Sequence, residues 1–311
     1  MTETLCGQVL YGINTIYTVH TDTGDIQCRI KGKVLRSDER SYNPIAAGDF
    51  VEIARDLHSE SQGMIVAVRE RRTRLIRWNK KGRARQVLAA NADLAVCVSS
   101  TQSPPFRPRF IDRVLAAAEA GGMTAAIVMN KADLGIGRDT EGRLADFRRI
   151  GYPVLVCSAR TGDGIATLQG ALLGKTVVFV GQSGVGKSSI LNSLEPGLGL
   201  RTGEISAKHD RGNHTTNFSL LVRMPDGTSI IDTPGIREME LADILPEELA
   251  YSFREFFPFA QRCAVPVCPH ENEPGCAVRA AVERGELHYD RYESYLRILF
   301  ELRESRRSVH G

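Results

Sequence analysis

A glycine-rich segment that ends in lysine and serine carries the most specific chemistry in this sequence. It reads Gly181, Gln182, Ser183, Gly184, Val185, Gly186, Lys187, Ser188 and Ser189. In such a segment, glycines let backbone N–H groups close around phosphates, Lys187 neutralises the β and γ phosphates, and the Ser188 hydroxyl binds Mg²⁺. An apolar run at 177–180 precedes it as a strand, and a helix is expected from Lys187. The pattern predicts a loop that binds the phosphates of a nucleotide.

A second motif predicts the base of that nucleotide. It consists of Asn130, Lys131, Ala132 and Asp133, directly after an apolar run at 125–129. Ligands bind where parallel strands end, so the motif should face the nucleotide. The Asp133 carboxylate can accept hydrogen bonds from N1–H and the exocyclic amine of guanine, whereas adenine offers an acceptor at N1. With Ser158 and Ala159, whose backbone could reach the guanine O6, this motif favours GTP and GDP over ATP.

A third motif would sense the γ phosphate. Asp232, Thr233, Pro234 and Gly235 follow an apolar run at 229–231. Asp232 can hold Mg²⁺ through water, and the Gly235 N–H can contact the γ phosphate. The polar stretch at 212–216 is typical of a switch, in which Thr215 or Thr216 would complete the Mg²⁺ shell. We favour Thr216.

The residue that positions the attacking water is not evident. Ile236 stands where many GTPases carry the glutamine for this role. His214, beside the switch threonines, is the best candidate for the catalytic side chain, and His209 is second. A backbone group or a group supplied by a partner is the third possibility. The isolated protein should therefore hydrolyse GTP slowly.

The order of the three motifs is unusual. The base-reading motif at 130–133 precedes the phosphate loop at 181–189, whereas the phosphate loop comes first in an ordinary small GTPase. The order is that of a circularly permuted GTPase. In this order, the segment after Gly235 connects the GTPase domain to the C-terminal part of the chain.

Three of the seven cysteines cluster near the C-terminus. Cys263, Cys268, His270 and Cys276 lie within fourteen residues, with prolines and a glycine between them. Three thiolates and one imidazole form a closed tetrahedral Zn²⁺ site with no position left for water. We therefore expect one structural zinc ion, which would supply folding energy to a short segment. A catalytic zinc is disfavoured because the ligand set is saturated.

Composition limits the remaining possibilities. The chain has 311 residues, 42% hydrophobic residues and a net charge of +3, which suit a globular protein of two or three domains. The scattered cysteines suit a reducing compartment. The sequence shows neither a signal-peptide pattern nor an apolar run of about 20 residues. We expect a cytoplasmic protein that does not associate with membranes.

The element pattern predicts a multi-domain fold. Five short strand-like runs in residues 1–72 predict a small OB-type β barrel, with an SH3-like barrel as the alternative. Residues 73–89 are expected to form a basic linker. Strands that alternate with helices over residues 90–236 predict a permuted α/β P-loop GTPase domain, and residues 237–311 a zinc-binding and helical domain.

Basic residues are concentrated beside the barrel. The run from Arg69 to Arg85 has Trp78 inside it and only Glu70 opposing its charge. A solvated linker is one interpretation. Contact with nucleic acid is favoured, because OB barrels bind single strands through basic grooves and stacking aromatics.

Together these motifs resemble the RsgA family of bacterial circularly permuted GTPases over essentially the whole chain. The resemblance implies GTP hydrolysis stimulated by the small (30S) ribosomal subunit, binding to its 16S rRNA in late assembly, and release after hydrolysis. It assigns GTP contacts to 130–133 and 181–189, zinc binding to the cysteine–histidine cluster, and the catalytic histidine to His214. From their positions in the motifs, we expect Lys187 and Thr216 to take part in catalysis with it. One departure is Asn213, where the family commonly has arginine.

We therefore expect a monomeric GTPase that acts on the small ribosomal subunit with Mg²⁺ and one Zn²⁺. The main alternative is a nucleotide-gated RNA-binding module in which turnover is incidental, and a zinc hydrolase is a distant third. GTP hydrolysis with and without small subunits separates the first two.

Overall fold

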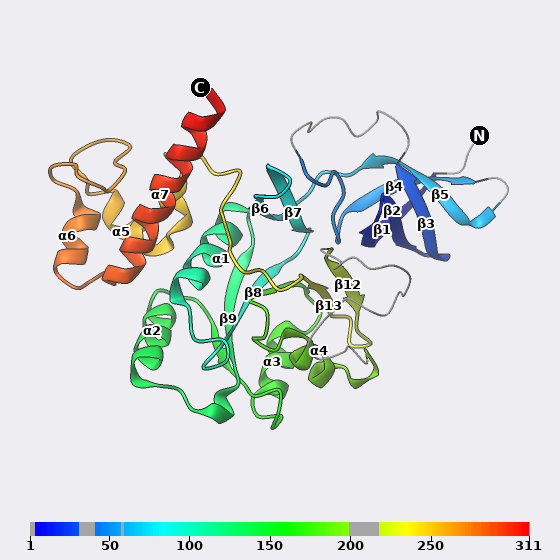
Figure 1. Cartoon of the computed structure of the whole chain (residues 1–311), viewed down its shortest axis with the longest axis horizontal. Helices are drawn as coiled ribbons and strands as arrows, with labels where there is room; N and C mark the ends of the chain where they lie inside the picture. Colours follow the sequence, from blue (N-terminus) through cyan, green and yellow to red (C-terminus); the bar gives the residue numbers. More distant parts are fainter. Residues whose placement is uncertain (1–3, 31–40, 57–58, 199–217, 311) are drawn as a thin grey trace.

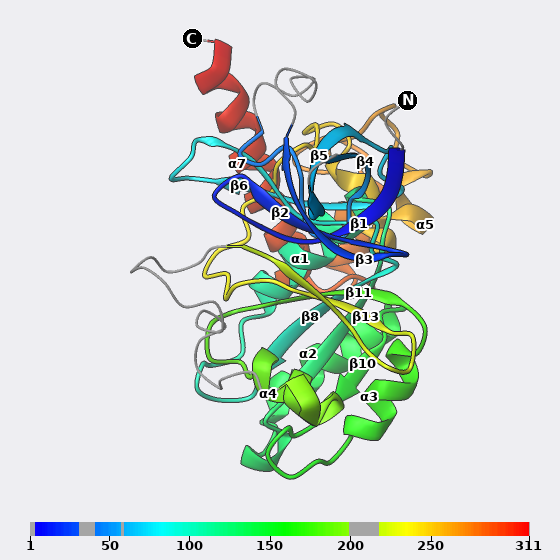
Figure 2. The ribbon, with the colours of Figure 1, turned by 90° about the vertical axis from the view of Figure 1, so that its right-hand side faces the viewer.

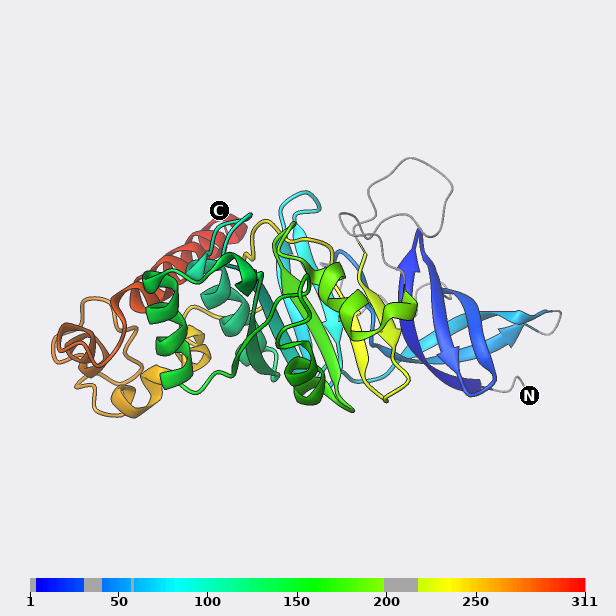
Figure 3. The same ribbon diagram turned by 90° about the horizontal axis from the view of Figure 1, so that it is seen from below.

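The computed structural model describes residues 4–30, 41–56, 59–198 and 218–310. These residues form three parts in a row. The N-terminal barrel and the C-terminal helical module lie at opposite ends of a central α/β domain (Figure 1, Figure 3). The central domain therefore contacts both of the others.

The N-terminal part is a closed five-stranded barrel. Its strands are β1 (Thr4–Ile13), β2 (Ile16–Thr21), β3 (Gly24–Ile30), β4 (Phe50–Asp56) and β5 (Ser59–Val68). They follow the order β1-β2-β3-β5-β4, with β3 parallel to β5 and β1 pairing with β4 to close the barrel. Val9, Val19 and Ile53 are among the buried residues that fill its interior. This is the OB-type barrel that the sequence predicts.

The barrel is seated on the central domain through a glycine and two amides. Gly48 lies so close to the main chain of the central domain that a Cβ atom there would be 2.1 Å from the Ala90 carbonyl oxygen. Its φ of +91° also favours glycine. Asn91 donates to the Gly48 carbonyl at 3.0 Å, and Arg223 donates to Gln8 at 2.9 Å. The barrel is thus joined to the central domain by one close backbone approach and two side-chain hydrogen bonds. Figure 2 shows the barrel from the side.

Residues 73–89, expected as a basic linker, contain a β hairpin. Its strands are β6 (Arg74–Asn79) and β7 (Ala84–Ala90), which pair antiparallel. Apolar residues on both strands explain the difference, because Leu75 of β6 and Leu88 of β7 are buried in the core of the central domain. The charged residues between them had hidden this apolar content.

The central domain is built on a six-stranded sheet. The order of its strands is β10-β9-β8-β11-β13-β12, all parallel except β12. The strands are β8 (Leu94–Ser100), β9 (Thr124–Asn130), β10 (Val154–Val156), β11 (Thr176–Gly181), β12 (Leu220–Arg223) and β13 (Ser229–Asp232). Every residue of β8 is buried, as expected of a strand covered on both faces.

Helices cover both faces of this sheet. The helices are α1 (Pro108–Ala120), α2 (Arg138–Arg149), α3 (Ile165–Leu172) and α4 (Lys187–Leu194). One hydrophobic core includes α1 and α2, and a second includes α3 and α4. The layers are those of the predicted P-loop domain, and they bring the carboxyl ends of β8, β9, β11 and β13 to one edge.

The C-terminal module packs on α1 and α2 (Figure 1). Its helices are α5 (Phe257–Ala260), α6 (Ala277–Glu283) and α7 (Tyr289–His310). An aromatic cluster forms its centre, in which the ring of Phe256 lies 5.3 Å from that of Phe253 and 5.0 Å from that of Tyr295. These residues belong to the same hydrophobic core as α1, so the module and the central domain form one packed unit.

A buried network of charges joins this module to the central domain. The Asp112 carboxylate of α1 accepts from Arg291 of α7 at 3.0 Å, from Arg143 of α2 at 3.2 Å and from Ser294 at 2.6 Å. Arg291 also donates to Glu255 at 2.6 Å. Burial alone would lower the pKa of Arg291, but the two carboxylates raise it. The charges are thus compensated inside the core.

We predict that Asp112→Ala lowers the free energy of unfolding by about 3–5 kcal/mol, because it leaves two buried guanidinium groups without their shared carboxylate. Urea unfolding monitored by circular dichroism measures the change. The control is Glu141→Ala, which removes an exposed partner of Arg148 at 2.9 Å and should cost about 1 kcal/mol or less. Equal losses in the two variants would contradict the role assigned to the network.

Candidate functional site

The glycine-rich segment forms a loop between β11 and α4. Gly184 and Gly186 have φ values of +83° and +93°, which other residues rarely adopt. A Cβ atom at Gly186 would lie 2.3 Å from the Asn130 amide nitrogen. The Lys187 ammonium group curls back over the loop and donates to the Gly181 carbonyl at 2.8 Å. The segment therefore has the shape of a phosphate-binding loop.

Lys187 is a buried cation. Burial lowers its pKa, and the nearby Asp232 carboxylate opposes that shift. A buried ammonium group at the start of a helix is suited to binding an anion with several negative charges. The anion would balance the positive charge, which the apolar core cannot do.

Asn130 links three loops at the carboxyl edge of the sheet. Its amide donates to the Val185 carbonyl of the phosphate loop at 2.9 Å. Its carbonyl oxygen accepts from the Ala159 N–H at 3.0 Å. The Lys131 ammonium group reaches the Gly184 carbonyl at 2.7 Å. The structure thus brings the two predicted base-reading segments and the phosphate loop together.

The Asp133 carboxylate lies beside the Ser158 segment. Ser158 donates its hydroxyl to one carboxylate oxygen at 2.5 Å, and Arg160 donates to the other at 2.9 and 2.6 Å. These hydrogen bonds, that of Ser158 first, lower the pKa of Asp133. The group is therefore a carboxylate, the form that accepts hydrogen bonds. Sequence reasoning missed Arg160 as a partner of Asp133.

Asp232 is a buried carboxylate at the end of β13. It pairs in register with Phe179 of β11, which places it next to the phosphate loop. Neither of its oxygens has a hydrogen-bond partner among the described residues. Burial raises its pKa to about 7, although Lys187 opposes the shift. A buried carboxylate without a partner is costly unless a cation compensates it, so this residue fits a Mg²⁺ site.

The segment after Asp232 lies directly on the phosphate loop. A Cβ atom at Gly235 would be 2.9 Å from the Cα atom of Ser183. The Ile236 N–H donates to the Gly181 carbonyl at 3.1 Å. The Ile236 side chain itself is buried in the core of the central domain. It therefore cannot position a water molecule at the phosphates.

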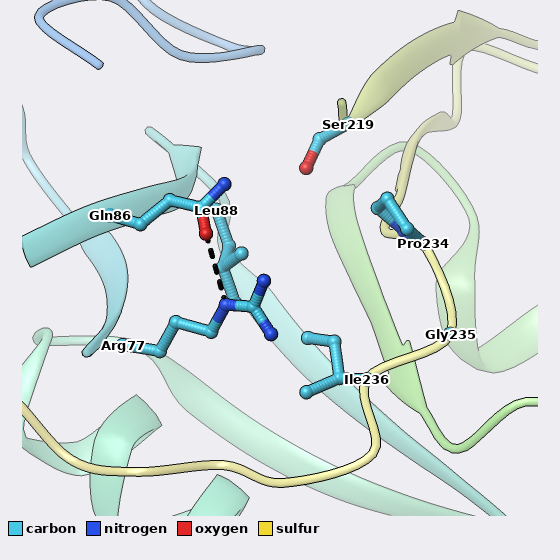
Figure 4. A pocket seen from close by; sticks show the side chains of 7 residues that line it. All are labelled: Arg77, Gln86, Leu88, Ser219, Pro234, Gly235 and Ile236. Carbon is cyan, nitrogen blue, oxygen red and sulfur yellow. Dashed lines mark hydrogen bonds between the residues drawn. The ribbon is translucent and has the colours of Figure 1, made fainter. Parts of the chain in front are cut away.

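A pocket separates this segment from the β6–β7 hairpin (Figure 4). It is lined by Arg77, Gln86, Leu88, Ser219, Pro234, Gly235 and Ile236. The Arg77 guanidinium group points into it and donates to the Gln86 side chain at 3.1 Å. Burial lowers the pKa of Arg77.

The residues after Ile236 run along the same hairpin. The Trp78 N–H donates to the Glu240 carbonyl at 2.9 Å. Lys80 pairs with Glu238 at 2.8 Å, and Asp243 pairs with Arg74 at 2.8 Å and with Arg85 at 2.5 Å. Much of the basic run is thus neutralised within the chain. The acidic residues at 238–243 were the sequence signal for this contact.

Three cysteines and one histidine meet in the C-terminal module. The potential ligand atoms of Cys263, Cys268, His270 and Cys276 all lie within 4.8 Å of one another. The Nδ1 atom of His270 is 3.6 Å from the Cys263 sulfur and 3.5 Å from the Cys276 sulfur. A tetrahedron with zinc–ligand distances of about 2.3 Å to sulfur and 2.0–2.1 Å to nitrogen has sulfur–nitrogen edges of about 3.6 Å. The cluster therefore fits a tetrahedral metal ion.

The histidine of this cluster is held in place by α7. Tyr292 donates its hydroxyl to the His270 carbonyl at 2.7 Å, and Tyr295 donates to the Pro269 carbonyl at 2.7 Å. The Arg279 N–H donates to the Cys276 sulfur at 3.4 Å. These contacts fix the ligand loop against the helices and are of the kind that orient metal ligands.

The predicted switch residues lie outside the described part of the chain. His209, His214, Thr215 and Thr216 belong to the segment 199–217. Ser219 at the pocket is the second described residue after that segment.

Comparison with known proteins agrees with this arrangement. A model of the RsgA GTPase family matches residues 68–242, and one of the RsgA N-terminal domain matches residues 6–65. The chain belongs to the RsgA GTPase family. The fold and the order of its motifs are thus those of a circularly permuted GTPase preceded by an OB-type barrel.

Relatives within this family match over nearly the full length. The small ribosomal subunit biogenesis GTPase RsgA of Chlorobaculum parvum is 41% identical over 313 residues, which is 98% of this chain and 100% of the relative. That of Bacteroides fragilis YCH46 is 38% identical over 305 residues, 96% of this chain and 98% of the relative.

Two solved structures share the fold. The crystal structure of YjeQ from Thermotoga maritima is 33% identical, with a TM-score of 0.73 over 96% of this chain and 99% of that one. YloQ, described as a circularly permuted GTPase, is 30% identical, with a TM-score of 0.69 over 97% of this chain and 96% of that one. Among the described residues, no helix is both long and apolar enough to cross a membrane.

We predict that Gly235→Ala lowers the rate of GTP hydrolysis by roughly 10- to 100-fold, because the added methyl group would push the Gly235 N–H away from the phosphate loop. The affinity for GDP should change by less than about threefold, since GDP lacks the γ phosphate. Single-turnover hydrolysis and GDP titration measure the two effects. Gly170→Ala is the control, because a Cβ atom there meets nothing within 4 Å. A Gly235→Ala variant with normal hydrolysis would contradict the role of this close approach.

Proposed function

We propose that this protein hydrolyses GTP to GDP and phosphate in late assembly of the small (30S) ribosomal subunit. The observation that carries the proposal is the convergence of the base-reading loops, the phosphate loop and an unpartnered Asp232 at one sheet edge. Family membership and the names of the full-length relatives support the choice of GTP and of the small subunit.

Different residues would bind the base, the phosphates and Mg²⁺. Asn130 joins the base-reading and phosphate loops, and Asp133 accepts hydrogen bonds from guanine, with Lys131 and Ala132 in the same turn and Ser158 and Ala159 opposite. Residues 181–189 enclose the phosphates and Lys187 balances their charge. Ser188, Asp232 and, from the undescribed segment, Thr216 would hold Mg²⁺. When bound, Mg²⁺ neutralises charge on the β and γ phosphates.

Hydrolysis needs a group that orients water, and Ile236 does not supply it because its side chain is buried. We assign this role to His214, on the basis of its place next to the switch threonines. Slow hydrolysis by the protein alone follows, with acceleration when the small subunit completes the catalytic site. His214→Ala should then abolish the accelerated hydrolysis and leave GDP binding intact, and unchanged acceleration would refute the assignment.

The γ phosphate would be read through the contact between Gly235 and the phosphate loop. From there the chain runs along the β6–β7 hairpin, to which it is bound by the Trp78–Glu240 hydrogen bond and by the ion pairs of Asp243. The hairpin in turn adjoins the barrel through Ala90. Loss of the γ phosphate would thus loosen the hairpin and favour release from the subunit, an order–disorder switch.

Two further assignments complete the proposal. The Cys263, Cys268, His270 and Cys276 cluster holds one structural Zn²⁺, which would keep the ligand loop folded. Atomic absorption tests this: we expect one equivalent of zinc in the wild-type protein and its loss in Cys276→Ser.

The barrel and the exposed turn of the β6–β7 hairpin would contact the 16S rRNA. This turn carries Lys81 and Arg83, whose side chains have no partner among the described residues. The protein would act as a monomer in the cytoplasm.

Purified small subunits should raise the rate of GTP hydrolysis by roughly 100-fold or more, as a partner that completes a GTPase site does. Phosphate release at fixed enzyme concentration, with and without subunits, measures it. ATP and purified large subunits are the controls, and neither should support the acceleration. Tight, GTP-dependent binding to the small subunit without acceleration would instead support a nucleotide-gated RNA-binding module.

A further inference from the structure

Arg160 makes a contact within the candidate site that the proposed function does not use. It follows Ser158 and Ala159 in the loop between β10 and α3. Its Nε and Nη2 atoms donate to the same Asp133 oxygen, Oδ2, at 2.9 and 2.6 Å. Its side chain is 74% exposed, whereas that of Asp133 is 9% exposed. Arg160 therefore covers the carboxylate from the solvent side.

The other Asp133 oxygen, Oδ1, has one acceptor position left. Oδ1 accepts one hydrogen bond, from the Ser158 hydroxyl, at 2.5 Å. A carboxylate oxygen offers two acceptor positions, so Oδ1 retains one and Oδ2, with two donors from Arg160, retains none. The two oxygens of Asp133 thus differ in what they can still accept.

Guanine requires both oxygens. Its N1–H and its exocyclic amine point in parallel, and a carboxylate binds them with one oxygen each. The base can form both bonds only if Arg160 gives up at least one of its own to Oδ2. Hypoxanthine, the base of inosine nucleotides, has N1–H but no exocyclic amine. It can bind to Oδ1 while Arg160 stays in place.

We propose that Arg160 competes with the guanine amine for Asp133 and thereby limits the discrimination between guanine and hypoxanthine. This inference rests on the proposed guanine-nucleotide function and deepens it. Arg160 acts as a specificity-determining residue that holds the carboxylate and must partly release it when the base binds.

The competition predicts a selective effect of Arg160→Ala. The affinity for GDP should rise about two- to fivefold, the range set by an exposed ion pair. The affinity for inosine diphosphate should stay the same, so the ratio of the two affinities should rise by the same factor. Arg160→Lys keeps the charge but not the two-pronged hydrogen bond, and it should fall between the wild type and Arg160→Ala.

Competition titrations of the full-length protein against a ribose-labelled fluorescent GDP measure all of these affinities. Arg148→Ala is the matched control, because it also removes an exposed arginine paired with a carboxylate, at 2.9 Å, but outside the site. It should leave both affinities unchanged.

Two results would overturn the proposal while leaving the function intact. Weaker GDP binding by Arg160→Ala would mean that Arg160 binds the base rather than competing with it. An equal change for GDP and inosine diphosphate would mean a general effect on the loop. If the wild-type protein bound neither nucleotide, the proposed function would fail together with this inference.

Discussion

The site depends on one constraint, the burial of two opposite charges at the carboxyl edge of the sheet. Asp232 lies next to the phosphate loop, which follows β11 and ends at Lys187. Among the described residues, the two side chains form no hydrogen bond with each other, and Lys187 donates only to carbonyls of the loop. Such charges are costly in a core. In the proposed function, a nucleotide with Mg²⁺ would supply an anion for Lys187 and a cation for Asp232. The glycines at 184, 186 and 235 allow the loops to pack this closely against one another.

The permuted order determines what is connected to this edge. Because the base-reading loops come first, the chain leaves the nucleotide directly after Gly235 and passes along the β6–β7 hairpin to the C-terminal module. That module is joined to α1 and α2 by a continuous core and by the Asp112–Arg291 network. In the proposed mechanism this module stays fixed. The hairpin, held at its rim by exposed ion pairs, would be the element that is released.

Elements could be predicted from the sequence where a single local motif was specific enough to allow one interpretation. Glycine-rich loops after apolar strands and the cysteine spacing have few interpretations, so the GTPase domain and the metal cluster were found. The hairpin was taken for a linker because its basic residues masked the apolar residues Leu75 and Leu88, which are buried. The Asp112 network and the Arg160–Asp133 contact join residues distant in sequence. Such contacts depend on the packed fold and leave no local signal.

Hydrogen exchange in the GDP complex and in the complex with a non-hydrolysable GTP analogue tests the central claim most directly. We expect the γ phosphate to increase protection of residues 232–243 and of the β6–β7 hairpin together, while the buried turns of α7 stay equally protected in both complexes. Changes confined to the phosphate loop, with the hairpin exchanging equally in both complexes, would contradict the claim that the segment after Gly235 transmits the state of the nucleotide.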